Sequence, residues 1–136
     1  MNTQKLLIGT IAGGITLFAA GFIIYVWLFG NSNIGMEPGA EGLMLENIKF
    51  PTIILMELVY GLLLTIILTW RGVANFSSGL SAGALIGLLI GFTFGLDLFS
   101  TTSLVNFNYV LFEAVTYAVR YGLAGGVIAL LIRSKS

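Results

Sequence analysis

The sequence contains no histidine and no cysteine, and only 9% of its 136 residues are charged. A soluble domain carries roughly 25% charged residues. Without His and Cys the chain lacks the usual ligands of zinc, haem and iron–sulfur clusters, the commonest general base and the thiol nucleophile. Six basic residues are too few for a nucleic-acid surface. We therefore expect no metal, no cofactor and no nucleic-acid partner, and we rank an enzyme last among the functions.

Hydrophobic residues make up 57% of the chain, and the mean hydropathy is +1.01. A helix needs about 20 apolar residues to cross the ~30 Å of hydrocarbon in a bilayer. Four stretches meet this requirement: Leu6–Phe29, Phe50–Trp70, Gly79–Phe99 and Tyr109–Ile132. The sequence predicts an all-α integral membrane protein, with residues 1–136 forming one domain of four transmembrane helices in the lipid bilayer.

The ends of these spans carry helix-start signals. Ser78 and Asn108 are of the residue types that cap helix N-termini, and Pro51 suits the first turn of the second span. The first span has 24 apolar-rich residues and ends in Tyr25, Trp27 and Phe29, so we expect it to remain as a span and not to be cleaved as a signal peptide.

Basic residues predict the orientation. Four of those outside the spans fall on the side of the N-terminus: Lys5, Arg71, Arg133 and Lys135. Only Lys49 falls on the other side, so the positive-inside rule predicts that both termini are cytoplasmic and that residues 30–50 form an outer loop. Part of this loop, residues 43–50, is either a surface turn or a short interfacial helix.

The two halves of the chain resemble each other. Residues 12–29 align with residues 82–99 without gaps and share six of 18 positions. The local sequence around Glu57 also parallels that around Glu113. One interpretation is a duplicated helical hairpin arranged as a parallel repeat. The other is coincidence, because spans made of Gly, Ala, Leu and Phe match one another easily.

Small residues recur every four positions in the third and fourth spans. They are Gly79, Gly83, Gly87, Gly91 and Gly95 in the third span, and Ala114, Ala118, Gly122 and Gly126 in the fourth. Residues four apart share a helix face, so this glycine zipper predicts a surface against which another helix packs closely. The partner helix belongs to the same chain, to a second copy or to another membrane subunit.

Four ionisable residues lie inside the predicted spans: Glu57, Asp97, Glu113 and Arg120. From the ~1.5 Å rise per residue, the three acids lie within ~10 Å of the outer ends and Arg120 lies ~16 Å deep. Side chains lean toward the helix N-terminus, so Arg120 is expected to lean toward Glu113, and Asp97 toward both. Tyr117 lies on the same face as Glu113 and Arg120, and Tyr60 is one turn from Glu57.

Three carboxylates and one guanidinium leave two negative charges if all are ionised. Buried uncompensated charge is costly, so we expect a proton or a bound cation at this polar cluster. The alternative is structural: Asp97 and Glu113 reach the interface, and Arg120 bridges Glu57 to Glu113.

With Glu57, the Gly-rich third span and Asp97 followed by Thr101 and Thr102, the chain resembles a group of small bacterial four-span inner-membrane proteins of unknown function. The resemblance covers most of the chain and implies a bacterial inner-membrane location, but no activity. Small four-span multidrug exporters carry an embedded Glu in their first helix; this chain has no acid in its first span, so we exclude membership of that family.

The sequence favours two functions equally. One is a carrier that handles a proton, a cation or a small solute through an outward-facing pocket of Glu57, Glu113 and Arg120. The other is an accessory subunit, which the glycine pattern and the small extramembrane portion favour. A homo-oligomer suits the first function, and other membrane subunits suit the second.

Overall fold

The computed structural model describes residues 2–29, 34–40 and 49–132, and these residues are almost entirely helical. Helix α1 (Thr3–Phe22) continues into a π-helical segment, η1 (Ile23–Leu28). It is followed by α2 (Phe50–Arg71), α3 (Phe76–Thr101) and α4 (Phe107–Ile132). With α1 and η1 taken together, all four helices are long and apolar enough to cross a membrane. The prediction of four spans in a multi-pass membrane protein is confirmed, and the ends differ by three residues at most.

Two of the predicted helix starts are wrong. Helix α3 begins at Phe76, and the side chain of Asn75 caps it by accepting a hydrogen bond of 2.8 Å from the Ser78 backbone N–H. Asn108 lies inside α4, and its N–H donates to the side chain of Asn106. In both cases the helix begins earlier than predicted, at a phenylalanine (Phe76 or Phe107) that directly follows an asparagine. Pro51 lies in the first turn of α2, as predicted.

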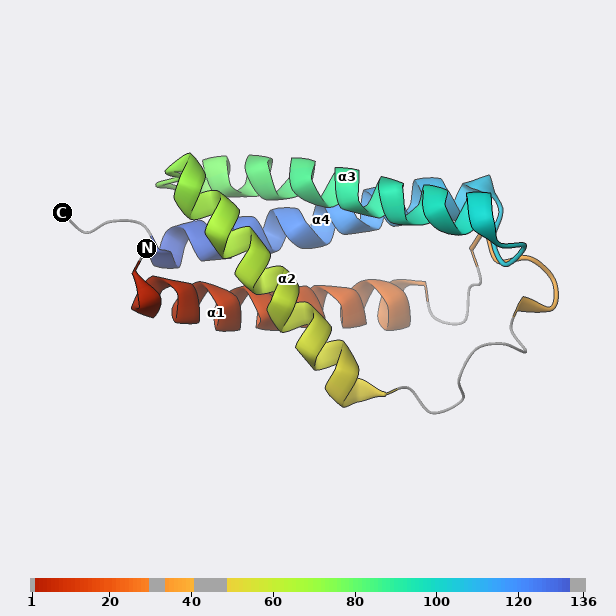
Figure 1. Cartoon of the computed structure of the whole chain (residues 1–136), viewed down its shortest axis with the longest axis horizontal. Helices are drawn as coiled ribbons and strands as arrows, with labels where there is room; N and C mark the ends of the chain where they lie inside the picture. The colour runs from red at the N-terminus through yellow and green to blue at the C-terminus, as the bar shows by residue number, and fades with distance from the viewer. Residues whose placement is uncertain (1, 30–33, 41–48, 133–136) are drawn as a thin grey trace.

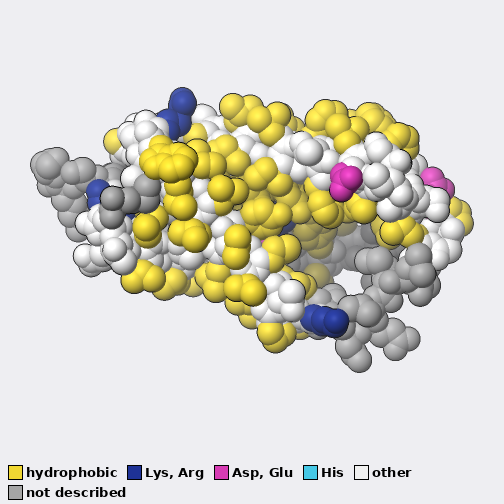
Figure 2. All heavy atoms as spheres, viewed as in Figure 1, with side chains coloured by type: hydrophobic (Ala, Val, Ile, Leu, Met, Phe, Trp, Pro, Cys, Tyr) yellow, Lys and Arg dark blue, Asp and Glu magenta, His cyan; other side chains and the backbone are white. Residues whose placement is uncertain are grey.

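Helix α4 occupies the centre of the bundle and is its most buried helix. Helices α3 and α1 flank it on two sides, while α2 crosses α1 obliquely (Figure 1). Hydrophobic side chains dominate the middle of the face drawn in Figure 2, over α2 and α3. This arrangement places the side chains of α4 against every other helix.

The two connections at one end of the bundle are joined to each other. Met36 and Val105 form an isolated antiparallel bridge, supported by backbone hydrogen bonds from Glu37 to Leu104 and from Asn106 to Gly35. Residues 34–40 therefore lie against the segment that leads into α4. The interfacial helix considered for residues 43–50 falls mostly outside the described residues.

The glycines of α3 face α4 along the whole length of the helix. All five are buried: Gly79, Gly83, Gly87, Gly91 and Gly95. A Cβ atom at Gly91 would lie 2.5 Å from the carbonyl oxygen of Glu113, and one at Gly87 would meet the carbonyl oxygen of Tyr117. Because these neighbours are backbone atoms, no residue larger than glycine fits at this distance.

Helices α1 and α2 make a similar close contact, but only where they cross. A Cβ atom at Gly61 of α2 would lie 2.6 Å from the carbonyl oxygen of Thr10, and one at Gly14 would lie 3.3 Å from the Cα atom of Leu58. Beyond the crossing, phenylalanines replace the glycines, and the rings of Phe18 and Phe50 have centroids 6.5 Å apart. The N-terminal half of α2 therefore stands apart from α4.

Candidate functional site

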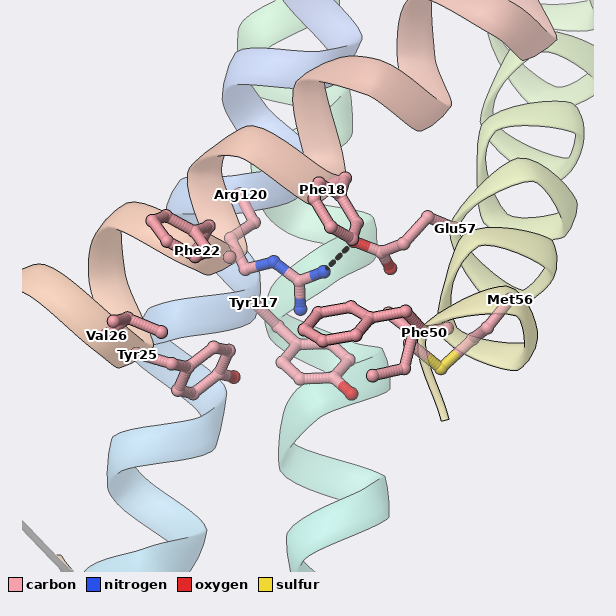
Figure 3. A pocket seen from close by; sticks show the side chains of 11 residues that line it. Phe18, Phe22, Tyr25, Val26, Phe50, Met56, Glu57, Tyr117 and Arg120 are labelled. Atoms are coloured by element: carbon pink, nitrogen blue, oxygen red, sulfur yellow. Dashed lines mark hydrogen bonds and ion pairs between the residues drawn. The ribbon is translucent and has the colours of Figure 1, made fainter. Parts of the chain in front are cut away.

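The polar centre of the bundle is an ion pair between two helices. Nη2 of Arg120 in α4 lies 2.5 Å from Oε2 of Glu57 in α2 (Figure 3). Both residues are buried, with relative exposures of 4% and 2%. A charge so placed is tolerated only with a partner, because the apolar surroundings cannot solvate it. The pair thus couples the N-terminal half of α2 to the core helix.

Helix α1 leaves room for the guanidinium. Gly21 faces it, and a Cβ atom at this position would lie 3.3 Å from Nε of Arg120. The carbonyl oxygen of Leu17 lies 3.5 Å from Nη2, at the limit of a hydrogen bond. The absent side chain at Gly21 is what lets Arg120 reach past α1 to α2.

Two tyrosine rings enclose the guanidinium. Its Cζ atom lies 5.3 Å from the ring centroid of Tyr117 and 5.8 Å from that of Tyr25, both within cation–π range. Tyr117 stacks in turn on Tyr121, and Tyr60 meets Tyr121 edge-on. Tyr60 and Tyr117, which we expected in the cluster, therefore belong to one row of aromatic rings beside the ion pair.

Glu113 is buried in the same region but has a different partner. The hydroxyl of Tyr25 donates a 3.1 Å hydrogen bond to Oε1 of Glu113. The expected lean of Arg120 toward Glu113 does not produce their pairing: in the described part of the chain Arg120 forms its ion pair with Glu57. Tyr25 links the two sites, because its ring covers Arg120 while its hydroxyl holds Glu113.

Tyr25 owes its position to the π-helical segment η1. The N–H of Phe29 donates to the carbonyl oxygen of Ile24, five residues earlier, which is the hydrogen bond of a π-helix. Such wide turns are frequent at functional sites. We did not predict Tyr25 as a site residue. A single tyrosine in an apolar segment does not indicate contact with a buried arginine and a buried carboxylate.

A cavity of about 310 Å³ opens beside the ion pair, between η1 and the N-terminal half of α2. Its polar side chains are Glu57, Arg120, Tyr25 and Tyr117, and its other walls are apolar (Figure 3). Oε1 of Glu57 and Nε of Arg120 are buried without a hydrogen-bond partner among the described residues. Buried polar atoms are seldom left unpaired, so the free oxygen of Glu57 suggests a binding partner outside the described residues.

Asp97 lies apart from this cluster. Its side chain is exposed on α3, although we expected it to lean toward Glu113 and Arg120. The reason is helical geometry: Gly95 faces α4, and a residue two positions later points about 200° away around the helix. The third acid expected in the polar cluster is therefore absent from it.

The small residues of α4 lie along the edge of α3. Gly122 faces Ala84 and Gly126 faces the ring of Phe76, whereas Ala118 is half-buried. The glycines of α3 instead meet the face of α4 that carries Tyr117, Tyr121 and Gly125. The two small-residue stripes are thus neighbours and do not face each other.

Within the described ranges, no group of three or more side chains is arranged to hold a metal ion. Comparison with known proteins gives no relative: no family model, no curated protein and no solved structure matches the chain.

Proposed function

We propose that this protein is a carrier of the bacterial inner membrane that handles a proton, a cation or a small solute at the cluster of Glu57, Glu113 and Arg120. The observation that supports this best is the carboxylate oxygen of Glu57, unpaired among the described residues, at the cavity between η1 and the N-terminal half of α2. Intramembrane ionisable residues of this kind commonly mark substrate or ion pathways.

The charges of the cluster also favour this function. Two buried carboxylates and one guanidinium leave one negative charge if all three are ionised. A proton or a cargo cation removes that surplus, and a carrier needs a site whose occupancy can change. Within the described part of the chain, Glu113 accepts a hydrogen bond from the neutral hydroxyl of Tyr25 and forms no ion pair.

The test is proton flux into liposomes that contain the purified protein and an enclosed pH-sensitive dye. We expect flux with the wild-type protein and its loss in Glu57→Gln. The matched control is Asp97→Asn, which removes an exposed carboxylate and should leave the proton flux unchanged. Equal flux in protein-free liposomes would refute proton handling.

The carrier proposal includes an orientation, with both termini cytoplasmic and residues 30–50 outside. The chain has no native cysteine, so single cysteines at position 38, which is exposed, and at position 135 can be tested with an impermeant thiol reagent. Labelling in intact cells at position 38 but not at 135 supports the orientation, and the reverse pattern contradicts it.

An accessory subunit is the second candidate. A shallow groove on the outside of α3 and α4 is lined by small and aliphatic residues: Leu80, Ala84, Ala118, Val119, Gly122 and Leu123. Such surfaces let another helix approach closely. Purification in mild detergent separates the two functions, because a stable partner of different mass supports a subunit and a lone homodimer supports the carrier.

A further inference from the structure

We propose that the cavity beside Glu57 binds a neutral, lipid-soluble phenol or alcohol whose hydroxyl donates a hydrogen bond to Oε1 of Glu57. The inference rests on the proposed function in one respect, because it names the small solute of the same pocket. It is carried by three features of the site: the walls of the cavity, the charges at its base and the rings that line it.

The walls face the bilayer. Phe22 and Val26 on one side, and Phe50 and Met56 on the other, line the cavity and are also exposed on the surface of the bundle. Figure 2 shows a hollow on this face beside the N-terminal half of α2. Because these surfaces lie in apolar spans, a ligand that passes between them comes from the lipid and must dissolve in it.

The charges at the base favour a neutral hydrogen-bond donor. Glu57 needs a donor at its free oxygen, so an anion or a molecule with acceptors alone does not fit there. Arg120 already neutralises Glu57 from the other side, and its guanidinium repels a second cation brought into the same cavity. A hydroxyl group supplies the missing donor without adding charge.

The rings favour a flat ligand body. Phe18, Phe22, Tyr25, Phe50 and Tyr117 line the cavity, and in Figure 3 several of them surround the guanidinium and the carboxylate. Aromatic side chains form offset or edge-to-face contacts with another ring. A volume of about 310 Å³ lies at the small end of ligand pockets, which suits a molecule of one or two fused rings.

The experiment measures the binding of four naphthalene compounds to the wild-type protein in nanodiscs by equilibrium dialysis, with empty nanodiscs subtracted. 1-Naphthol is neutral and donates, 1-methoxynaphthalene cannot donate, 1-naphthylmethylamine is a cation at pH 7, and 1-naphthoate is an anion. We expect saturable binding of 1-naphthol at one site, and binding at least about tenfold weaker for the other three, as a hydrogen bond to a charged acceptor predicts. Equal binding of all four, or tighter binding of the amine, overturns the proposal.

A pair of variants locates the site without touching Glu57. Ile53 lines the cavity, whereas Leu55 is exposed and does not line it. Ile53→Trp fills the cavity and should abolish 1-naphthol binding, while Leu55→Trp, an equal increase in size, should bind like wild type. Equal binding by the two variants places the ligand elsewhere and refutes the inference.

The binding and flux experiments can fail independently. Binding of 1-naphthol without proton flux supports the inference and rejects proton handling. Proton flux without binding of 1-naphthol rejects the inference alone.

Discussion

The two helical hairpins of this bundle use glycine over different lengths. In the hairpin of α3 and α4, glycines contact the partner backbone from Gly79 to Gly95, and the helices stay close from end to end. In the hairpin of α1 and α2, the close contact is confined to a crossing near Gly13, Gly14 and Gly61. Past that crossing the two helices separate (Figure 1). The ion pair of Glu57 and Arg120 lies in this part of the bundle (Figure 3).

This difference indicates how an apolar chain can make room for charge. Glycine at every fourth position brings two helices to backbone contact and leaves no volume between them. Where phenylalanines stand in place of glycines, their rings separate α1 from α2 and line a cavity; these residues are Phe18, Phe22 and Phe50. The tight hairpin is then a rigid support, and the open hairpin carries the site.

The largest expected effect tests the open hairpin. Arg120→Leu should lower the free energy of unfolding by about 3–5 kcal/mol, because it leaves Glu57 buried without its charged partner. The measurement is a thermal melt of the purified protein in detergent. Arg71→Leu, which removes an exposed arginine at the end of α2, is the control and should have little effect.

Combining Arg120→Leu with Glu57→Gln should restore part of the lost stability, since the orphaned charge is removed as well. The coupling free energy between such neighbours is about 0.5–3 kcal/mol. Combination with Glu113→Gln should restore less, because Tyr25 and not Arg120 bonds to that carboxylate. Strictly additive losses in both pairs would show that the three residues do not form one site.

The second effect tests the tight hairpin. Gly87→Leu places a side chain against the carbonyl oxygen of Tyr117, which is backbone and cannot rotate away. Overpacking typically costs about 1–3 kcal/mol, and we expect the upper part of that range here. Leu88→Gly, on the neighbouring exposed position, should cost less. If Gly87→Leu keeps wild-type stability and oligomer size, α3 does not pack on α4 as described.

Sequence patterns predicted the tight hairpin better than the open one. Hydropathy and the four-residue spacing of glycine are local properties, and they were enough to predict four spans and a close-packed face on the third. The partner of Arg120 depends on how three helices assemble. The tilt of side chains toward the N-terminus of α4 predicted Glu113 as the partner. The space left by Gly21 instead lets the guanidinium reach Glu57. The position of the Tyr25 side chain depends on a π-helical turn, which no residue spacing in the sequence predicts.

A smaller effect tests the link between the two carboxylates. Tyr25→Phe removes the hydroxyl that donates to Glu113 and keeps the ring over Arg120. Leaving a buried acceptor unpaired should cost about 1–2 kcal/mol in the same thermal melt. Tyr109→Phe, a half-buried tyrosine of α4, is the matched control. Equal behaviour of the two variants would mean that the bond to Glu113 contributes nothing to stability.

The smallest expected effect distinguishes Asp97 from the buried acids. Asp97 is exposed on α3, two residues beyond a glycine that faces α4, so its carboxylate points away from the cluster. Substitutions at such positions usually change stability by less than about 0.5 kcal/mol, and we expect this of Asp97→Asn in the thermal melt. Glu57→Gln, which makes the same chemical change at a buried and paired carboxylate, should be clearly more destabilising. If Asp97→Asn destabilises the protein as much as Glu57→Gln, the exposed carboxylate has a partner outside the described residues. A second copy or another subunit that covers this end of α3 would supply such a partner, and the tight hairpin would then serve as an interface as well as a support.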